Sequence, residues 1–186
     1  MRITGGESKG RTLNFPSRST SRPTSDFLRE TLFNLLGDIS GQNFLDLFAG
    51  SGSVGLEALS RKARKVVFVE KNKSLSGIIL RNVSSCGYAD KSVVISTDFQ
   101  IALRGFFEKQ CRFDVIFSDP PYHQGLIEET LKQLVKFPLL LKDGIIVLQH
   151  SDKEKPSELP DGIFITDQRK YGENFLTFAR IEINGR

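Results

Sequence analysis

The chain has 186 residues, of which 39% are hydrophobic and 26% are charged, and its net charge is +4. This length suits one domain, and the composition is typical of a folded globular protein and not of a disordered one. The sequence contains no apolar run of the roughly 18 residues that a membrane span needs. It shows neither a secretory signal nor a cysteine spacing suited to a disulfide or zinc site, so we expect a cytoplasmic protein without a metal.

The N-terminal part is basic. A basic segment suits a phosphate-rich partner, although a solvated basic terminus explains the charge equally well. Two extended stretches, 2–4 and 11–15, are candidates for a hairpin around residues 5–10. A helix should begin after Thr24 or Ser25 and run to Leu36, with Gly37 ending it. We expect residues 1–40 to form a small extension packed on a core domain of residues 41–186.

From residue 43 onward, short apolar strands alternate with helices. This alternation predicts an α/β fold, a Rossmann-like and mostly parallel doubly wound sheet of seven strands whose last two form an antiparallel hairpin. The expected strands are 44–48, 66–70, 92–96, 114–118, 144–149, 162–170 and 176–183, and the expected helices after the first are 54–61, 74–85, 100–108 and 126–135. Ligands of such sheets bind beyond the carboxyl ends of the strands.

Glycines follow the first core strand. Gly50, Gly52 and Gly55 match G-x-G-x-x-G, a pattern shared by many nucleotide-binding loops and by plain tight turns. Glu70 stands at the end of the second strand, 18 residues after Gly52, where an acid can accept hydrogen bonds from ribose hydroxyls. The two signals together favour an adenosine-type ligand. After the third strand, Asp98 suits an adenine amino group or, equally, a helix cap.

The loop after the fourth strand is the most specific string in the chain. It reads Asp119, Pro120, Pro121 and Tyr122. The two prolines stiffen the loop, and they leave carbonyl acceptors without the usual N–H donors. The carboxylate accepts hydrogen bonds, and the tyrosine ring offers a face for stacking a base. Such a loop suits a planar group that carries an NH2.

The glycine loop within FLDLFAGSGSVGLEAL, the acid after the second strand and DPPY together resemble class I S-adenosyl-L-methionine-dependent methyltransferases that act on exocyclic amines. The segments MRITGGESKGRTL, RPTSDFLRETLFN and YGENFLTFAR are similar to the RsmD-like family, which methylates guanine N2 in small-subunit (16S) ribosomal RNA. The resemblance extends from residue 2 to about residue 180. It implies a monomer that acts on 16S ribosomal RNA or on an intermediate of small-subunit assembly.

The resemblance also implies roles for particular residues. The catalytic loop that holds the flipped guanine would be Asp119, Pro120, Pro121 and Tyr122. The cofactor would be held at its methionine, ribose and adenine parts by Asp46, Phe48, Ala49, Gly50, Ser51, Gly52, Glu70, Lys71, Asp98 and Phe99. The RNA side would be lined by Arg2, Lys9, Arg11, Arg22, Thr24, Asp26 and Arg29.

Other functions remain open at this point. A DPPY-type adenine-N6 methyltransferase of DNA or RNA uses the same loop, but fewer than 40 residues follow the core sheet, which leaves little surface for reading DNA. A methyltransferase of a protein glutamine amide fits the chemistry, although the basic N-terminus disfavours it. In a nicotinamide-dependent dehydrogenase, DPPY would have no role in hydride transfer. A catalytically inactive RNA-binding module would need neither the glycine loop nor the DPPY loop.

Overall fold

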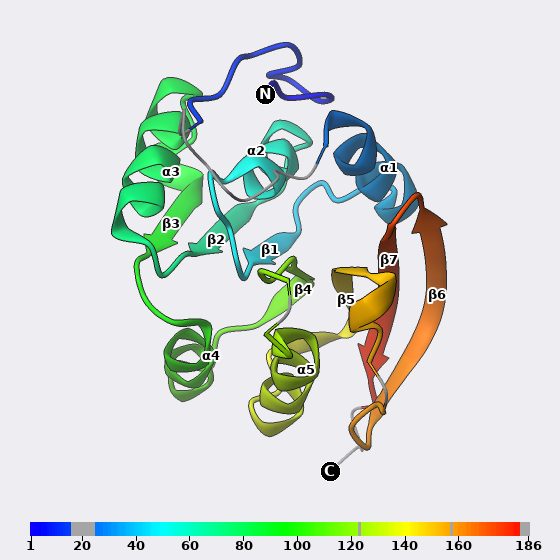
Figure 1. Ribbon diagram of the computed structural model, residues 1–186. Helices are drawn as coiled ribbons and strands as arrows, with labels where there is room; N and C mark the ends of the chain where they lie inside the picture. The colour runs from blue at the N-terminus through cyan, green and yellow to red at the C-terminus, as the bar shows by residue number, and fades with distance from the viewer. Residues whose placement is uncertain (16–24, 123, 157, 183–186) are drawn as a thin grey trace.

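The computed structural model describes residues 1–15, 25–122, 124–156 and 158–182. Its centre is one seven-stranded sheet in the order β3-β2-β1-β4-β5-β7-β6 (Figure 1). The strands are β1 (Asn43–Asp46), β2 (Lys65–Val69), β3 (Ser92–Ile95), β4 (Phe113–Ser118), β5 (Leu140–Ser151), β6 (Ile163–Tyr171) and β7 (Asn174–Ile181).

The five strands from β1 to β5 run parallel, and β7 is antiparallel to both β5 and β6. The order of the strands reverses between β1 and β4, and the loops after these strands separate there to leave room for a ligand. The expected doubly wound sheet with a C-terminal antiparallel hairpin is therefore confirmed.

The sheet lies between two layers of helices. The helices are α1 (Asp26–Leu36), α2 (Ser53–Ser60), α3 (Lys73–Ser85), α4 (Phe99–Glu108) and α5 (Leu126–Lys136). Figure 1 shows α1, α2 and α3 on one face and α4 and α5 on the other. Neighbouring strand residues point to opposite faces, so Phe44 belongs to the first core cluster and Leu45 to the second. Both layers are needed because β1, β2 and β4 are apolar on each face.

Several strand boundaries differ from the prediction by two or more residues, and two of these differences have a clear structural cause. β1 ends at Asp46 and not at residue 48, because the chain turns away there to place Ala49 N–H against the Val69 carbonyl at 3.0 Å. β5 begins at Leu140 and not at residue 144, because it pairs with β4 from Phe113 onward through a register shift. The predicted helices agree with the observed ones to within one residue at each end.

The N-terminal residues pack over α2 on the outer side of the sheet (Figure 1). The predicted hairpin is reduced to one antiparallel bridge between Arg2 and Thr12. Glu57 of α2, which is fully buried, accepts hydrogen bonds from the N–H and hydroxyl of Thr4 at 2.8 and 2.9 Å. Asn82 of α3 binds both backbone groups of Asn14, at 2.8 and 3.0 Å. The segment is thus tied to two helices through buried polar side chains.

Within the described ranges, no helix is long and apolar enough to cross a membrane. The same residues contain no group of three or more His, Cys, Asp or Glu side chains arranged to hold a metal ion. Cys86 is buried and Cys111 is half-buried, and both are free thiols.

Candidate functional site

A cavity of about 740 Å³ opens at the carboxyl ends of β1, β2, β3 and β4. This volume lies in the range of sites for small molecules and cofactors. Except for Gly52, every residue expected to be catalytic or to bind the cofactor lines it: Asp46, Phe48, Ala49, Gly50, Ser51, Glu70, Lys71, Asp98, Phe99, Asp119, Pro120, Pro121 and Tyr122. The topology thus gathers loops that are up to 76 residues apart in the sequence.

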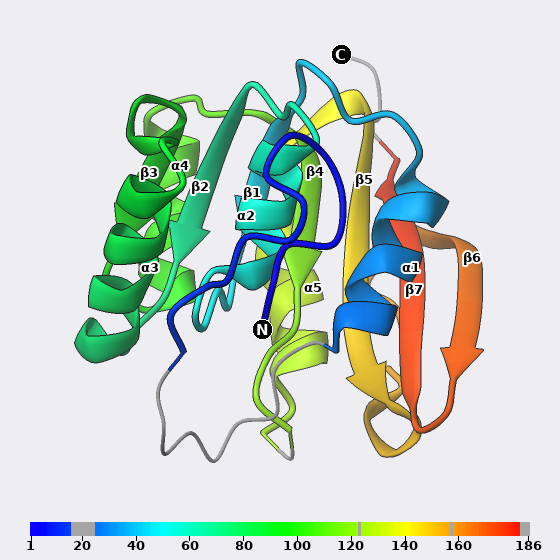
Figure 2. The same cartoon turned by 90° about the horizontal axis from the view of Figure 1, so that it is seen from above.

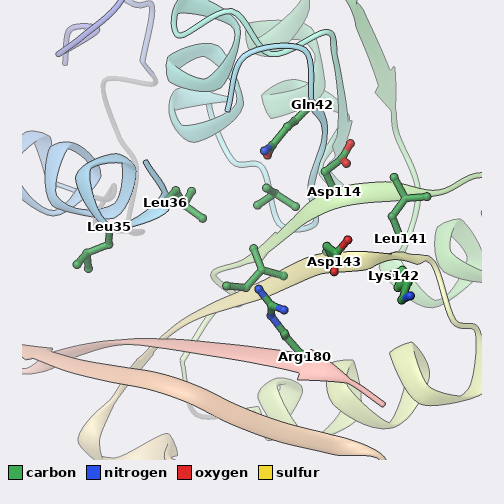
Figure 3. Close-up of a pocket in the computed structure, with 11 residues that line it drawn as sticks. Leu35, Leu36, Gln42, Asp114, Leu141, Lys142, Asp143 and Arg180 are labelled. Atoms are coloured by element: carbon green, nitrogen blue, oxygen red, sulfur yellow. The ribbon is translucent and has the colours of Figure 1, made fainter. Parts of the chain in front are cut away.

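A second cavity, of about 510 Å³, lies at the opposite edge of the sheet, near the start of β4 and β5. Figure 3 shows Asp114, Asp143 and Arg180 among its lining side chains. Asp114 has a structural task there, because its Oδ2 accepts a hydrogen bond from Asn43 N–H at 2.7 Å and so fixes the entry to β1. The candidate site is therefore the first cavity, at the edge where such sheets bind ligands.

Two glycines shape the loop after β1. Gly52 precedes α2 with φ of +83°, a left-handed conformation that side chains rarely adopt. A Cβ at Gly55 would lie 2.2 Å from Cε1 of Phe68 in β2, so only glycine lets α2 pack this close to the sheet. Gly52 therefore supports the cavity from behind the loop, and Gly50 and Ser51 form its wall.

Asp46, the last residue of β1, is a buried carboxyl with one backbone donor. Its Oδ2 accepts a hydrogen bond from Gly55 N–H at 3.0 Å, and the side chain is 2% exposed. Burial raises the pKa of Asp46 to about 7; the Gly55 hydrogen bond lowers it, and the charges of Asp119 and Glu70 raise it further. A positively charged ligand would relieve this repulsion and favour the ionised form.

Glu70 links the loops after β1 and β2. One carboxylate oxygen accepts from Gly50 N–H and the other from Asn72 N–H, each at 2.8 Å. Each carboxylate oxygen has two lone pairs, so Glu70 retains capacity for ligand hydroxyl groups. With Asp46 and Asp119 it makes the cavity rich in carboxylates, and this set of acceptors suits a cationic ligand that carries hydroxyls.

Asp98 fills one of the two roles that the sequence left open, the helix cap, and it also lies at the cavity. Its side chain caps α4 by accepting from Gln100 N–H at 2.9 Å, and the same residue lines the cavity. Phe99 begins α4, and its ring centroid lies 5.0 Å from that of Phe48. These two rings form an apolar wall beside Asp98, which suits a flat heterocycle with a polar edge.

The DPPY loop, residues 119–122, follows β4 directly. Asp119 is half-buried, and its Oδ2 accepts a hydrogen bond from Nε2 of Gln149 in β5 at 2.9 Å. Tyr122 is 40% exposed, and its hydroxyl donates to Oδ1 of Asn174 at 3.0 Å. The loop is therefore held at both ends by side chains from the neighbouring strands β5 and β7.

Sequence reasoning missed several residues that shape the site. Gln149 and Asn174 hold the DPPY loop, and Phe15 of the N-terminal segment lines the cavity. Asn82 donates to the carbonyl of Ser51 at 3.1 Å while it binds Asn14, so it joins the glycine loop to that segment. Asn174 lies within the segment YGENFLTFAR, but its role is not visible there, because Gln149, Asn174 and Asn82 each contact a partner at least 30 residues away.

The residues expected on the RNA side fall into three groups. Arg2, Lys9 and Arg11 are exposed, as is part of Asp26, which pairs with Arg2 and Arg29, and Arg22 and Thr24 lie outside the described residues. Arg29 requires a correction, because its side chain is fully buried and pairs with Glu57 at 3.3 Å and with Asp26 at 2.8 Å. A guanidinium enclosed in this way joins α1 to α2 and is not accessible to a nucleic acid.

Neither histidine has an assigned role in the site. His150 is buried in β5, with Nδ1 2.8 Å from the Ser151 carbonyl and Nε2 2.9 Å from the Thr177 hydroxyl. Burial lowers its pKa, which favours a neutral ring. Both ring nitrogens of His150 are thus within hydrogen-bond distance of a partner, and His123 lies outside the described residues.

Comparison with known proteins gives consistent results across the chain. A family model described as conserved hypothetical protein 95 matches residues 1–180. The ribosomal RNA small subunit methyltransferase D of Haemophilus influenzae is 33% identical, over 92% of this chain and 89% of its own. The protein of the same name from Escherichia coli K12 is 37% identical, over 80% and 74%. The solved structure of a hypothetical protein from Thermus thermophilus superposes with a TM-score of 0.81 at 34% identity, over 96% of this chain and 98% of that one.

Proposed function

The chain belongs to the RsmD-like family, conserved hypothetical protein 95, and on that premise we propose that it methylates the exocyclic N2 amine of a guanine in 16S ribosomal RNA. The coarser activity, methyl transfer from S-adenosyl-L-methionine to ribosomal RNA, follows from family membership. One observation carries the proposal: a single cavity joins the carboxylate-rich loops of β1 and β2 to the DPPY loop.

The residues of the cavity fit the cofactor by their chemistry. Asp46 offers a buried carboxyl that a positive charge would stabilise, and Glu70 offers free lone pairs to ribose hydroxyls. Asp98 stands beside the rings of Phe48 and Phe99 and would hold the adenine. When bound, S-adenosyl-L-methionine would supply a methyl group made electrophilic by its sulfonium charge. The chain then has two tasks, to align the amine and to exclude water.

Asp119 and the Pro120 carbonyl would act on the amine. The lone pair of an exocyclic amine is delocalised into the ring, which makes the nitrogen a poor nucleophile. Hydrogen bonds from its two N–H groups to Asp119 and to the Pro120 carbonyl would direct the lone pair out of the ring plane. As the new N–C bond replaces the methyl–sulfur bond of the cofactor, the nitrogen would lose a proton, and the Asp119 carboxylate would accept it. The Gln149 amide keeps that carboxylate oriented, since it donates to Oδ2.

Tyr122 would stack on the extruded base. Removing a base from a duplex costs a few kcal/mol, and stacking on an aromatic ring returns about 1–3 kcal/mol. Tyr122→Phe keeps the ring and loses the exposed hydrogen bond to Asn174, so near-normal kinetics are expected. Tyr122→Ala should raise KM for RNA roughly 10-fold. Steady-state kinetics of the two variants check this, and equal KM values for both would mean that the ring does not stack.

The function itself is tested by methyl transfer from labelled S-adenosyl-L-methionine. Unmodified 16S ribosomal RNA, naked and in partly assembled small subunits, would be offered beside double-stranded DNA, followed by digestion and identification of the labelled nucleoside. The expected product is N2-methylguanosine in the RNA. Label in adenine, in either nucleic acid, would refute guanine-N2 specificity and support the adenine-N6 alternative, which uses the same DPPY chemistry. Label in protein alone would refute a nucleic-acid substrate.

A further inference from the structure

A row of aromatic side chains leads away from the DPPY loop. The Tyr122 hydroxyl donates to Asn174, which pairs across the β6–β7 turn with Tyr171. The ring of Tyr171 meets that of Phe27, at the start of α1, with centroids 6.2 Å apart and planes at 73°. We call Tyr122, Tyr171 and Phe27 the aromatic row. Figure 2 shows the start of α1, the β6–β7 turn and the loop after β4 at the same edge of the sheet.

Phe27 is the least protected member of the row. It is 66% exposed, while the next residue of α1, Leu28, is 4% exposed and belongs to the core. α1 therefore buries its apolar face through other residues and does not need a phenyl ring at position 27 to fold. A large exposed apolar side chain that continues a candidate binding site is typical of a surface that contacts a partner.

We propose that the aromatic row stacks unpaired nucleotides that flank the methylated base in the RNA substrate. The inference rests on the proposed function and deepens it, because it assigns a binding surface beyond the base at Tyr122. Aromatic rings stack any base through its π-face, and proteins that read single-stranded RNA use such rings in series. The substrate recognised would then be a loop or strand end and not a continuous duplex.

Positive charge is available at the Phe27 end of the row. The side chain of Arg2 is 72% exposed and lies 3.8 Å from Asp26, the residue before Phe27. Arg2 remains exposed beside this acidic neighbour, so it can approach a phosphate. A protein partner would find the same apolar ring, but it would not require three rings in series from the catalytic loop.

The test compares three variants of Phe27 for binding to a single-stranded fragment of 16S ribosomal RNA that the wild-type protein methylates. The same sequence in a duplex is measured beside it. Phe27→Ala and Phe27→Leu should weaken binding to the single strand about 10-fold, because both lack a ring, and Phe27→Trp should keep wild-type affinity. Duplex binding, kcat and the Kd for S-adenosyl-L-methionine should not change. Ile101→Ala is the matched control, since Ile101 is also 66% exposed but lies on α4, on the opposite face of the sheet.

Two results would overturn the aromatic row as a base-stacking surface. One is unchanged affinity for the single strand in both Phe27→Ala and Phe27→Leu. The other is a loss of affinity that appears only with partly assembled subunits and not with naked RNA, which would indicate a contact with protein. Failure of the proposed function looks different: the wild type would then transfer no methyl group to 16S ribosomal RNA, while the binding measurements would still decide the role of the row.

Discussion

Asp119→Ala is expected to lower kcat for methyl transfer by at least roughly 100-fold, the lower end of what a positioned proton acceptor contributes. The substitution removes an acceptor for the amine N–H and for its proton, and it also leaves the buried Gln149 amide without the 2.9 Å contact. The cofactor residues of β1 and β2 are untouched, so the Kd for S-adenosyl-L-methionine should stay within a few-fold of wild type. Single-turnover kinetics and calorimetry measure the two quantities separately.

Two further variants sharpen this prediction. Asp119→Asn keeps an acceptor oxygen and removes the negative charge, so its residual rate separates orientation of the amine from acceptance of its proton. Asp143→Ala removes a carboxylate that lines the other cavity and should leave kcat unchanged. Near-normal turnover in Asp119→Ala would exclude this residue from the chemistry.

Asp46→Asn is expected to make the free protein more stable and to weaken its binding of the cofactor. The pKa of Asp46 is raised to about 7 from its ordinary value of 3.8, so the native state binds the proton more tightly than the unfolded chain. Between these values, the contribution of Asp46 to stability falls as pH rises, and it is lowest above pH 7. The amide keeps the oxygen that accepts from Gly55 and carries no charge. Unfolding free energy at pH 8 should therefore rise by on the order of 1–2 kcal/mol.

The loss of affinity should depend on the charge of the ligand. Without the carboxylate, Kd for S-adenosyl-L-methionine should rise roughly 10- to 100-fold, the usual value of a hydrogen bond or contact with a charged group. S-adenosylhomocysteine has no sulfonium charge, so its Kd should rise less. Denaturant unfolding at pH 5 and pH 8 gives the stability difference, which should be larger at pH 8. Equal losses for both ligands, or a stability gain independent of pH, would contradict the electrostatic role of Asp46.

Much of the fold was predictable because the signals were local. The period of apolar residues placed the helices, and Ser25 caps α1 as expected, with its hydroxyl accepting from Leu28 N–H at 3.1 Å. The motif residues met at one edge of the sheet because parallel strands end together. The division of the chain at residue 40 and the individual roles of the site residues stay predictions.

What the sequence could not predict depends on tertiary contacts. The resemblance implies that Arg29 lies on the RNA side, and only the structure shows that its side chain is buried against Glu57, 28 residues away. Gln149 lies within an ordinary apolar strand, and its side chain matters because β5 pairs with β4 beside Asp119. Likewise, Asn174 accepts the hydrogen bond from Tyr122 because the terminal hairpin lies beside the DPPY loop.

The buried contacts of Glu57 and Asn82 bear on how this protein can be divided. A chain limited to residues 41–186 would lose three of the donors to Glu57, from Thr4 and Arg29, and would keep only Arg61. Asn82 would lose its two hydrogen bonds to the backbone N–H and carbonyl of Asn14. Unpaired polar groups in the interior are costly, about 1–3 kcal/mol each and more for a charge. We therefore expect the leading segment and the core to unfold as one cooperative unit, and not to be exchangeable between relatives as separate modules.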